Sequence, residues 1–122
     1  MEKSTVSTNR KAYYEFQIIE TFEAGIELLG SEVKSLREGN ASLRESYVLI
    51  KKGQAWLVGM HISAYSHTGF SGHEPVRKRR LLLHKNEILK INQKLAEKGL
   101  TAVPLKVYFN KRGWLKVEIS LA

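Results

Sequence analysis

Apolar and polar residues alternate in short runs along most of this chain, and such runs predict β-strands. The aromatic and β-branched residues of 13–22 predict the first strand, which follows a polar segment, 1–8, that we expect to be frayed. Residues 47–50 and 54–62 predict a hairpin around a short turn. The Gly, Ser and Pro residues between 63 and 75 predict a loop.

The last part of the chain has the clearest period-two pattern. Apolar residues occupy every second position of 103–109 and again of 115–121, on either side of Lys111-Arg112-Gly113. Each of these strands is therefore expected to have one buried face and one exposed face. Pro104 lacks a backbone N–H, so we expect it at a strand end, at a sheet edge or in a bulge.

Two segments have helical spacing. Apolar residues three apart after Ser31 predict a short helix, with Ser31 as its N-cap and Gly39 at its C-terminal end. The residues expected to face outward or sideways on it are Glu32, Lys34, Ser35 and Arg37. A longer helix is predicted over 86–98, where Gly99 stops it. Its apolar face is expected to contain Ile88, Ile91 and Leu95, widened by Leu89 and Ala96.

Several short antiparallel strands with two or three short helices, and no strand–helix–strand rhythm, indicate a mainly β protein with helices. The expected architecture is a small antiparallel β-barrel with the helices packed on it. A length of 122 residues suits one domain, so we expect a single domain over 1–122.

The charge of the chain is uneven. Residues 1–61 hold eight Lys or Arg and eight Glu, whereas residues 62–122 hold twelve Lys or Arg and four Glu, so the second half carries the whole net charge of +8. Such an excess indicates a polyanionic partner, either nucleic acid or an anionic membrane surface. The basic helix 86–98 fits a membrane surface only roughly, because its apolar face is needed to cover the core. We therefore favour RNA.

The chain has no Cys, which excludes disulfides, cysteine-ligated zinc fingers and thiol catalysis. No apolar run has the roughly 20 residues that span a bilayer, and the polar N-terminal segment has no signal-peptide core, so we expect a cytoplasmic protein. His61, His67 and His73 have irregular spacing and no Asp beside them, so we expect no metal site, no cofactor and no catalytic residue. A small RNA-processing enzyme remains an alternative.

The basic segment 77–80, followed by Leu81-Leu82-Leu83, carries the most information about a ligand. Strand alternation places Arg77 and Arg79 on one face and Lys78 and Arg80 on the other, so only one pair reaches a phosphate. The other pair is expected to snorkel or to meet a Glu. The alternative is a solvated strand edge with no ligand. Among the aromatic residues, Tyr14, Phe16 and Phe109 are expected in the core, and those that can stack on bases are Tyr13, Trp56, Tyr65, Phe70 and Trp114.

Six short motifs occur in an order that resembles the SsrA-binding protein (SmpB) family. They are Asn9-Arg10-Lys11-Ala12, Glu23-Ala24-Gly25-Ile26, Ser31 to Arg37, Ser46-Tyr47, Arg77 to His84 and Val103-Pro104-Leu105. The resemblance covers nearly all of 9–122. It implies a barrel related to the oligonucleotide-binding fold and a protein that catalyses no reaction.

The resemblance also implies a function. Proteins of this family bind the tRNA-like domain of transfer-messenger RNA (tmRNA), near its elbow and D-loop, and help to deliver it to stalled ribosomes for trans-translation. Through the RNA, elongation factor Tu and alanyl-tRNA synthetase become indirect partners. No membrane is involved. A general binder of single-stranded or structured RNA, of the oligonucleotide-binding type, remains the alternative.

The RNA-binding residues implied by the motifs are Asn9, Arg10, Lys11, Glu32, Lys34, Arg37, Arg77, Lys78, Arg79, Arg80, Leu82, His84 and Lys85. An acid beside phosphates is repelled, so Glu32 either accepts hydrogen bonds from a guanine edge or orients a neighbouring Arg or Lys. His84, often Asn in this family, either caps the following helix or bonds to RNA. On this view, changing Lys34 or Arg79 to Ala weakens RNA binding and leaves the fold intact.

The family usually continues beyond a Leu-Ala pair such as Leu121-Ala122 with a basic tail, which the resemblance places in the empty mRNA channel of the ribosome. The printed sequence contains no such tail. We therefore expect this chain to bind the RNA and yet to support tagging poorly.

Overall fold

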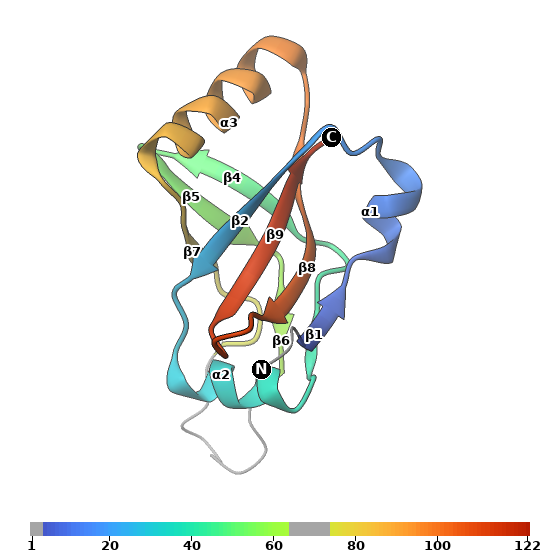
Figure 1. Cartoon of the computed structure of the whole chain (residues 1–122), viewed down its shortest axis with the longest axis vertical. Coiled ribbons are helices and arrows are strands. Elements are labelled where there is room, and N and C mark those ends of the chain that lie inside the picture. The colour runs from blue at the N-terminus through green and yellow to red at the C-terminus, as the bar shows by residue number, and fades with distance from the viewer. Residues whose placement is uncertain (1–3, 64–73) are drawn as a thin grey trace.

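The computed structural model describes residues 4–63 and 74–122, and within these ranges strands outnumber helices (Figure 1). The elements are β1 (Ser4–Thr8), α1 (Arg10–Glu15), β2 (Glu20–Ile26), α2 (Gly30–Arg37), β3 (Ala41–Ser42), β4 (Tyr47–Lys51), β5 (Gln54–Val58), β6 (His61–Ile62), β7 (Arg79–Leu82), α3 (Lys85–Lys98), β8 (Ala102–Phe109) and β9 (Leu115–Leu121). The expected class, mainly β with helices, is confirmed. None of the three helices in the described part is long and apolar enough to cross a membrane.

Seven of the strands form one antiparallel sheet in the order β1-β8-β9-β2-β7-β5-β4, and β3 pairs separately with β6. Strand β2 joins the two halves of the large sheet, because its first residues pair with β9 and Gly25 and Ile26 pair with β7. The two end strands, β1 and β4, do not pair with each other. The expected closed barrel is therefore not confirmed.

The main core lies on the face of the sheet that α3 covers (Figure 1). Ile88, Ile91 and Leu95 of α3 pack against it, as their spacing predicts. The expected wider stripe is wrong, because Leu89 is 58% exposed and Ala96 is also exposed. The C-terminal end of α3 is as expected, with the cap Gly99 at φ +63 in the left-handed region.

The N-terminal part differs from the prediction. Residues Ser4–Thr8 form β1 and pair with β8, so they are not a frayed end. Instead of a strand that starts at Tyr13, helix α1 begins at Arg10, after Asn9. The Asn9 side chain accepts a hydrogen bond from the Ala12 amide at 3.3 Å and donates to the Pro104 carbonyl at 2.9 Å. This cap is fixed by a residue 95 positions away, which local propensity does not reveal.

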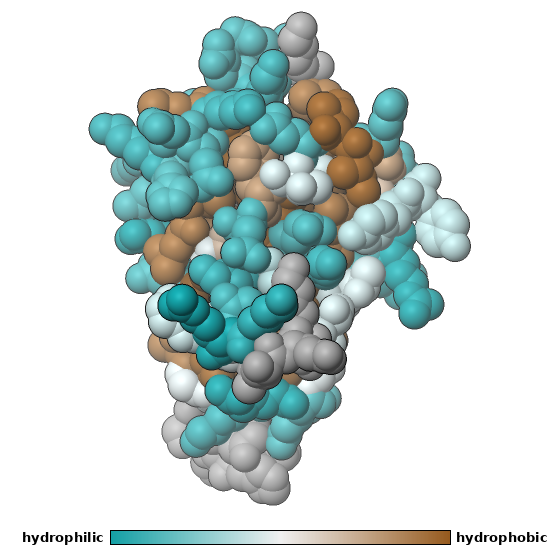
Figure 2. Space-filling view, in the orientation of Figure 1, coloured by the Kyte–Doolittle hydropathy of each residue, from teal (hydrophilic) through white to brown (hydrophobic). Residues whose placement is uncertain are grey.

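Strand β8 is buried on both faces, although alternation predicts one exposed face. Pro104 lies at a β-bulge in the pairing with β9, one of the three places expected for it. Across the bulge, Val103 and Leu105 pack under Ala12 of α1, whereas Val107 belongs to the main core. Helix α1 therefore covers Val103 and Leu105 of the predicted apolar face, and Pro104 and Tyr108 of the face expected to be exposed are buried as well. Figure 2 shows an apolar patch over this end of the molecule, near the C-terminal end of β9.

The predicted strand 54–62 is divided in two. Strand β5 ends at Val58, and Gly59 has φ +86, after which β6 pairs with β3. A Cβ at position 59 would lie 2.6 Å from the Glu45 carbonyl oxygen. Only glycine fits this turn without displacing its neighbours, so the hairpin β4–β5 is shorter than predicted.

Candidate RNA interface

Glu32, the acid among the predicted RNA-binding residues, is completely buried (0% exposed). Helix α2 begins at Gly30 rather than after Ser31, and the Leu29 amide donates to Glu32 Oε1 at 2.8 Å. Arg79 Nε donates to Glu32 Oε2 at 2.6 Å. Arg77 donates through Nη2 to Oε1 at 2.6 Å and through Nε to Oε2 at 3.0 Å. Glu32 thus orients two arginines, the second of its two expected uses. Glu32 and Ser35, expected to face outward or sideways, are both buried, so an outward direction is wrong for these two residues.

Arg79 is buried as completely as Glu32. Its guanidinium also donates to the carbonyls of Met60 at 2.8 Å, Pro75 at 3.1 Å and Arg77 at 3.1 Å. These bonds satisfy the guanidinium inside the protein, so Arg79 offers nothing to a phosphate in this structure. The expectation that Arg79→Ala leaves the fold intact does not fit this burial.

The electrostatics of this cluster favour its charged form. Burial alone would raise the pKa of Glu32, but the hydrogen bonds from Arg77, the Leu29 amide and Arg79 outweigh it. The pKa of Glu32 therefore lies below its usual value. Burial lowers the pKa of Arg79, and Glu32 partly offsets this effect. An arginine stays protonated all the same.

Lys78 and Arg80 lie on the opposite face of the basic segment, as alternation predicts. Arg80 pairs in register with Trp56 of β5, and Lys78 Nζ lies 5.7 Å from the centre of the Trp56 ring. Arg80 Nε is 3.5 Å from Glu27 Oε1, and both of these side chains are partly exposed. Lysine and arginine side chains can bind phosphates, and an indole ring beside them can stack on a base. We call the surface of Trp56, Lys78, Arg80 and Leu82 the β7 face.

The β7 face continues into an open depression beside β2. Leu82 is 44% exposed and pairs with Gly25, where a Cβ would approach it to 3.3 Å. The depression is lined by Glu23, Gly25, Leu82, Leu83, His84, Glu87 and Lys116. Glu23 accepts a hydrogen bond from the Tyr108 hydroxyl. Burial, this bond and nearby Glu118 raise the pKa of Tyr108. Sequence reasoning missed Glu23 and Lys116 as lining residues, although Glu23 stands in one of the quoted motifs.

His84 and Lys85 lie where β7 leads into α3. His84 occupies the N-cap position, but its side chain makes no capping hydrogen bond. Instead, the Glu87 carboxylate accepts from the His84 amide at 2.9 Å. The exposed imidazole is therefore not needed for the cap, and it lies at the rim of the depression. Lys85 is exposed in the first turn of α3.

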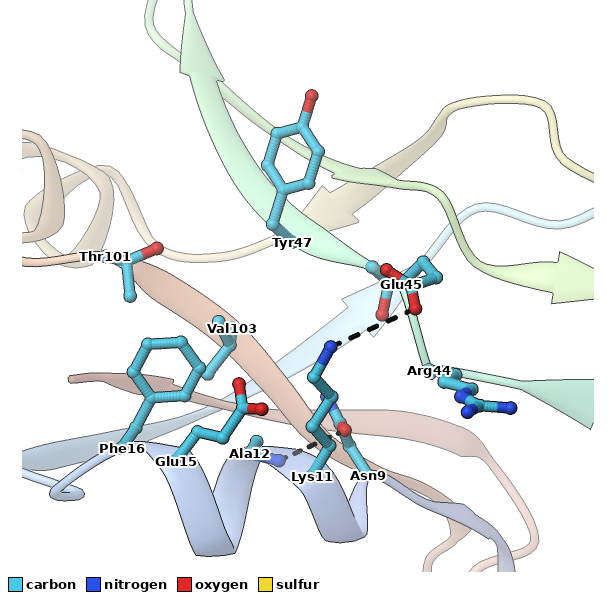
Figure 3. A pocket seen from close by; sticks show the side chains of 11 residues that line it. Asn9, Lys11, Ala12, Glu15, Phe16, Arg44, Glu45, Tyr47, Thr101 and Val103 are labelled. Atoms are coloured by element: carbon cyan, nitrogen blue, oxygen red, sulfur yellow. Dashed lines mark hydrogen bonds and ion pairs between the residues drawn. The ribbon is translucent and has the colours of Figure 1, made fainter.

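A second surface lies between α1 and the start of β4 (Figure 3). Lys11 Nζ is 4.0 Å from Glu45 Oε1 across this groove, and both side chains are largely exposed. Arg10, Lys11 and Arg44 also border an adjacent hollow with hydroxyl groups of Ser7, Thr8 and Ser42. Sequence reasoning missed Arg44, because it lies outside the basic segments. Asn9 is buried and bonds within the protein, so its side chain belongs to the framework of this groove.

The remaining predicted cations lie in the last turn of α2. Lys34 and Arg37 are both exposed there. The Arg37 guanidinium carbon lies 5.2 Å from the centre of the Phe109 ring. The predicted residues therefore form three exposed groups and one buried cluster rather than one continuous site.

The aromatic residues and histidines singled out in the sequence lie partly at the surface and partly outside the described residues. Tyr14 is 90% exposed, so its expected place in the core is wrong, and Trp114 is 63% exposed. Tyr65, Phe70, His67 and His73 lie outside the described residues. Within residues 4–63 and 74–122, no three His, Cys, Asp or Glu side chains are grouped as a metal site would need.

Comparison with known proteins identifies relatives over the whole chain. The family model described as SmpB protein matches residues 6–122. The SsrA-binding protein of Chlorobaculum tepidum is 59% identical over 121 residues, which cover 99% of this chain and 77% of that protein. The SsrA-binding protein of a Sulfurihydrogenibium species is 56% identical over 122 residues, or 100% of this chain and 80% of that protein.

A solved structure agrees with these sequence matches. A chain of "tmRNA-SmpB: a journey to the center of the bacterial ribosome" superposes with a TM-score of 0.78 at 45% identity, covering 93% of this chain and 80% of that one. Sequence and fold point to one family over almost the same residues. This chain belongs to the SmpB protein family.

Proposed function

We propose that this chain binds the tRNA-like domain of tmRNA and helps to deliver it to stalled ribosomes for trans-translation. The observation that carries this conclusion is the 59% identity to an SsrA-binding protein over 99% of the chain. The related structure that names tmRNA, SmpB and the bacterial ribosome supports the same partners. We also propose that elongation factor Tu and alanyl-tRNA synthetase act with it only through the RNA, and that it works in the cytoplasm without catalysing a reaction.

The β7 face is the part that we assign to structured RNA. Lys78 and Arg80 point outward beside Trp56, and Leu82, His84 and Lys85 follow along β7 and into the start of α3. This set combines cations for phosphates, one ring for stacking and an exposed apolar side chain for a base or sugar. We infer that Lys34 and Arg37 of α2 contribute further phosphate contacts.

The groove beside α1 supplies a second set of cations. The guanidinium groups of Arg10 and Arg44 form no ion pair or hydrogen bond with the other described residues, and the Lys11 ammonium has only its long contact with Glu45. We infer that Arg10, Lys11 and Arg44 contact RNA phosphates. Asn9, Glu32 and Arg79 support binding from inside the protein, and Arg77 does so in large part.

The curvature of the sheet bears on the domain and on its relation to other folds. We propose that 1–122 acts as one RNA-binding domain and that its curved sheet is related to the oligonucleotide-binding barrel. The contact between β4 and β8, which are not neighbours in the sheet, supports strong curvature.

A competition assay tests the function against the alternative of a general RNA binder. Labelled tRNA-like domain is bound to the protein at moderate salt, and unlabelled tRNA-like RNA, the same RNA without its D-loop, or poly-U is added. The intact tRNA-like RNA is expected to compete best, and the version without the D-loop less well. Equal competition by poly-U would favour the general binder. Release of cleaved RNA with magnesium, lost in a His or Glu variant, would instead favour an enzyme.

A further inference from the structure

We propose that Glu32 is a positioning residue for RNA binding: it holds the buried Arg79 and the partly buried Arg77 on the inner face of the basic segment and thereby directs Lys78 and Arg80 outward. The inference rests on the proposed function, because it explains how the β7 face is formed. It assigns to a fully buried acid a role in binding a polyanion.

Glu32 and the two arginines tie together three separate parts of the chain. The carboxylate lies at the start of α2 and accepts four hydrogen bonds, one from the Leu29 amide and three from Arg77 and Arg79. Arg79 then reaches the Met60 carbonyl after β5 and the Pro75 carbonyl before β7. The Ile62 amide also donates to Pro75 at 2.9 Å. The cluster therefore fixes the path of the chain into the basic segment.

The cluster also decides which faces of the segment point in and out. In a run of four cations, the sequence of the run does not decide which side chains turn toward the core, because each of them prefers water. A buried guanidinium with a second, partly buried one beside it needs an acid between them, since the two cations otherwise repel each other without compensation. Once Arg77 and Arg79 are held by Glu32, strand geometry sends Lys78 and Arg80 to the other face. Their position next to Trp56 shows this result.

Only a carboxylate fits this arrangement. All four neighbouring groups are N–H donors, and both carboxylate oxygens accept. Glutamine has nearly the same shape, but its amide places an NH₂ donor against the donors of an arginine. Glu32→Gln therefore removes the clamp with little change in volume.

The sign of the effect makes the proposal testable. Neutralising an acid near RNA normally strengthens binding or leaves it unchanged, because repulsion of phosphates is reduced. We expect Glu32→Gln to weaken binding of the tRNA-like domain instead, by roughly tenfold or more. The matched control is Glu38→Gln, at the exposed C-cap of the same helix, which is expected to keep or slightly raise the affinity. Unchanged or stronger binding by Glu32→Gln would overturn the proposal.

A double-mutant cycle separates positioning from other roles. Glu32→Gln is measured in the native background and in the background of Lys78→Ala with Arg80→Ala. If Glu32 acts through these two cations, its effect is expected to shrink to less than about twofold once they are absent. The same fold loss in both backgrounds would mean direct contact or general destabilisation, and the proposal would fall. Thermal unfolding confirms that each variant is folded at the assay temperature.

Amide hydrogen exchange gives a readout without RNA. Glu32→Gln is expected to speed exchange at Ile62 and Glu27, whose amides bond to Pro75 and Arg80, while Val107 and Val117 in the core stay protected. Uniform acceleration would indicate global destabilisation and count against positioning. If Glu32→Gln does not fold, Arg77→Lys loosens the same clamp while keeping the charge and the buried Arg79–Glu32 pair. If the native chain does not prefer the tRNA-like domain over poly-U, the proposed function fails. Amide hydrogen exchange and the double-mutant cycle then still test whether Glu32 positions Arg77 and Arg79.

Discussion

At the scale of single residues, side chains of the same charge differ completely in burial in this protein. Arg79 and Lys78 are neighbours, yet Arg79 is fully buried with a carboxylate partner and Lys78 is exposed beside an indole ring. Removing one partner of a buried ion pair leaves the other charge without water or a counterion. The loss of an exposed charge costs little by comparison.

This difference predicts how two alanine variants unfold. Arg79→Ala is expected to lower the free energy of unfolding by about 3–5 kcal/mol, because Glu32 loses a buried partner and three carbonyls lose a donor. Lys78→Ala is expected to change it by about 0.5 kcal/mol or less. Urea denaturation followed by circular dichroism measures both values. Similar stability of the two variants would contradict the buried network.

The low pKa of Glu32 predicts part of the loss of folding stability at acid pH. Its folded-state pKa lies below the ordinary value of 4.5, so its stabilising contribution is fully present above pH 4.5. That contribution is lost as the pH falls through the lower folded value. The native chain is therefore expected to lose stability more steeply below pH 4.5 than a folded Glu32→Gln variant. Denaturation midpoints between about pH 3 and 6 measure the two slopes, and parallel curves would rule out this contribution.

At the scale of elements, long-range packing decides the ends and faces of the strands. Helix α1 replaces a predicted strand because Asn9 is anchored to Pro104 and Ala12 packs on Val103 and Leu105. The long predicted strand after residue 54 stops at Gly59, where the backbone meets Glu45. In both places a contact distant in sequence outweighs the local pattern.

Two glycines of the β4–β5 region allow a matched test of this packing. Gly53 and Gly59 both have positive φ, at +75 and +86, but a Cβ at position 53 would meet open space. Each change to Ala is expected to cost roughly 1–2 kcal/mol in backbone strain. Gly59→Ala is expected to cost a further 1–3 kcal/mol or so, because its Cβ collides with the Glu45 carbonyl. Equal denaturation midpoints for the two variants would contradict the close approach.

At the scale of the whole molecule, the exposed cations occupy separate surfaces. The β7 face lies four strands from β1 in the sheet order, about 19 Å along the sheet at ordinary strand spacing, and Arg10, Lys11 and Arg44 lie beside β1. In the view of Figure 1, α1 and β1 lie at the right of the molecule and β7 lies at the left. We therefore expect one RNA to reach both surfaces only by extending around the sheet or by using different segments.

This separation predicts the salt dependence of binding. If about five phosphates are neutralised, log affinity for the tRNA-like domain should fall with log salt with a slope of roughly −3 to −5. Arg44→Ala and Arg80→Ala are each expected to reduce the steepness by about 0.7–0.9, and their effects should add because the sites are far apart. Affinity titrations at several salt concentrations measure the slopes. An unchanged slope for Arg44→Ala would remove the α1 groove from the RNA interface.

The sequence by itself determined the class of fold, the long helix, three permitted places for Pro104, of which a bulge is one, and the family. These features follow from local periodicity, from proline lacking an N–H, and from motifs that are read in order. The sequence also predicted that Arg77 and Arg79 lie opposite Lys78 and Arg80, because strand alternation is a local rule.

Only the tertiary structure decided which of these pairs faces the solvent. That choice depends on Glu32, which lies 47 positions from Arg79 and is brought to it by the packing of α2. The groove formed with Arg44 and the depression over Gly25 likewise combine residues from strands and helices that are distant in the chain. Burial of a charge is a property of its three-dimensional neighbours, so periodicity alone cannot supply it.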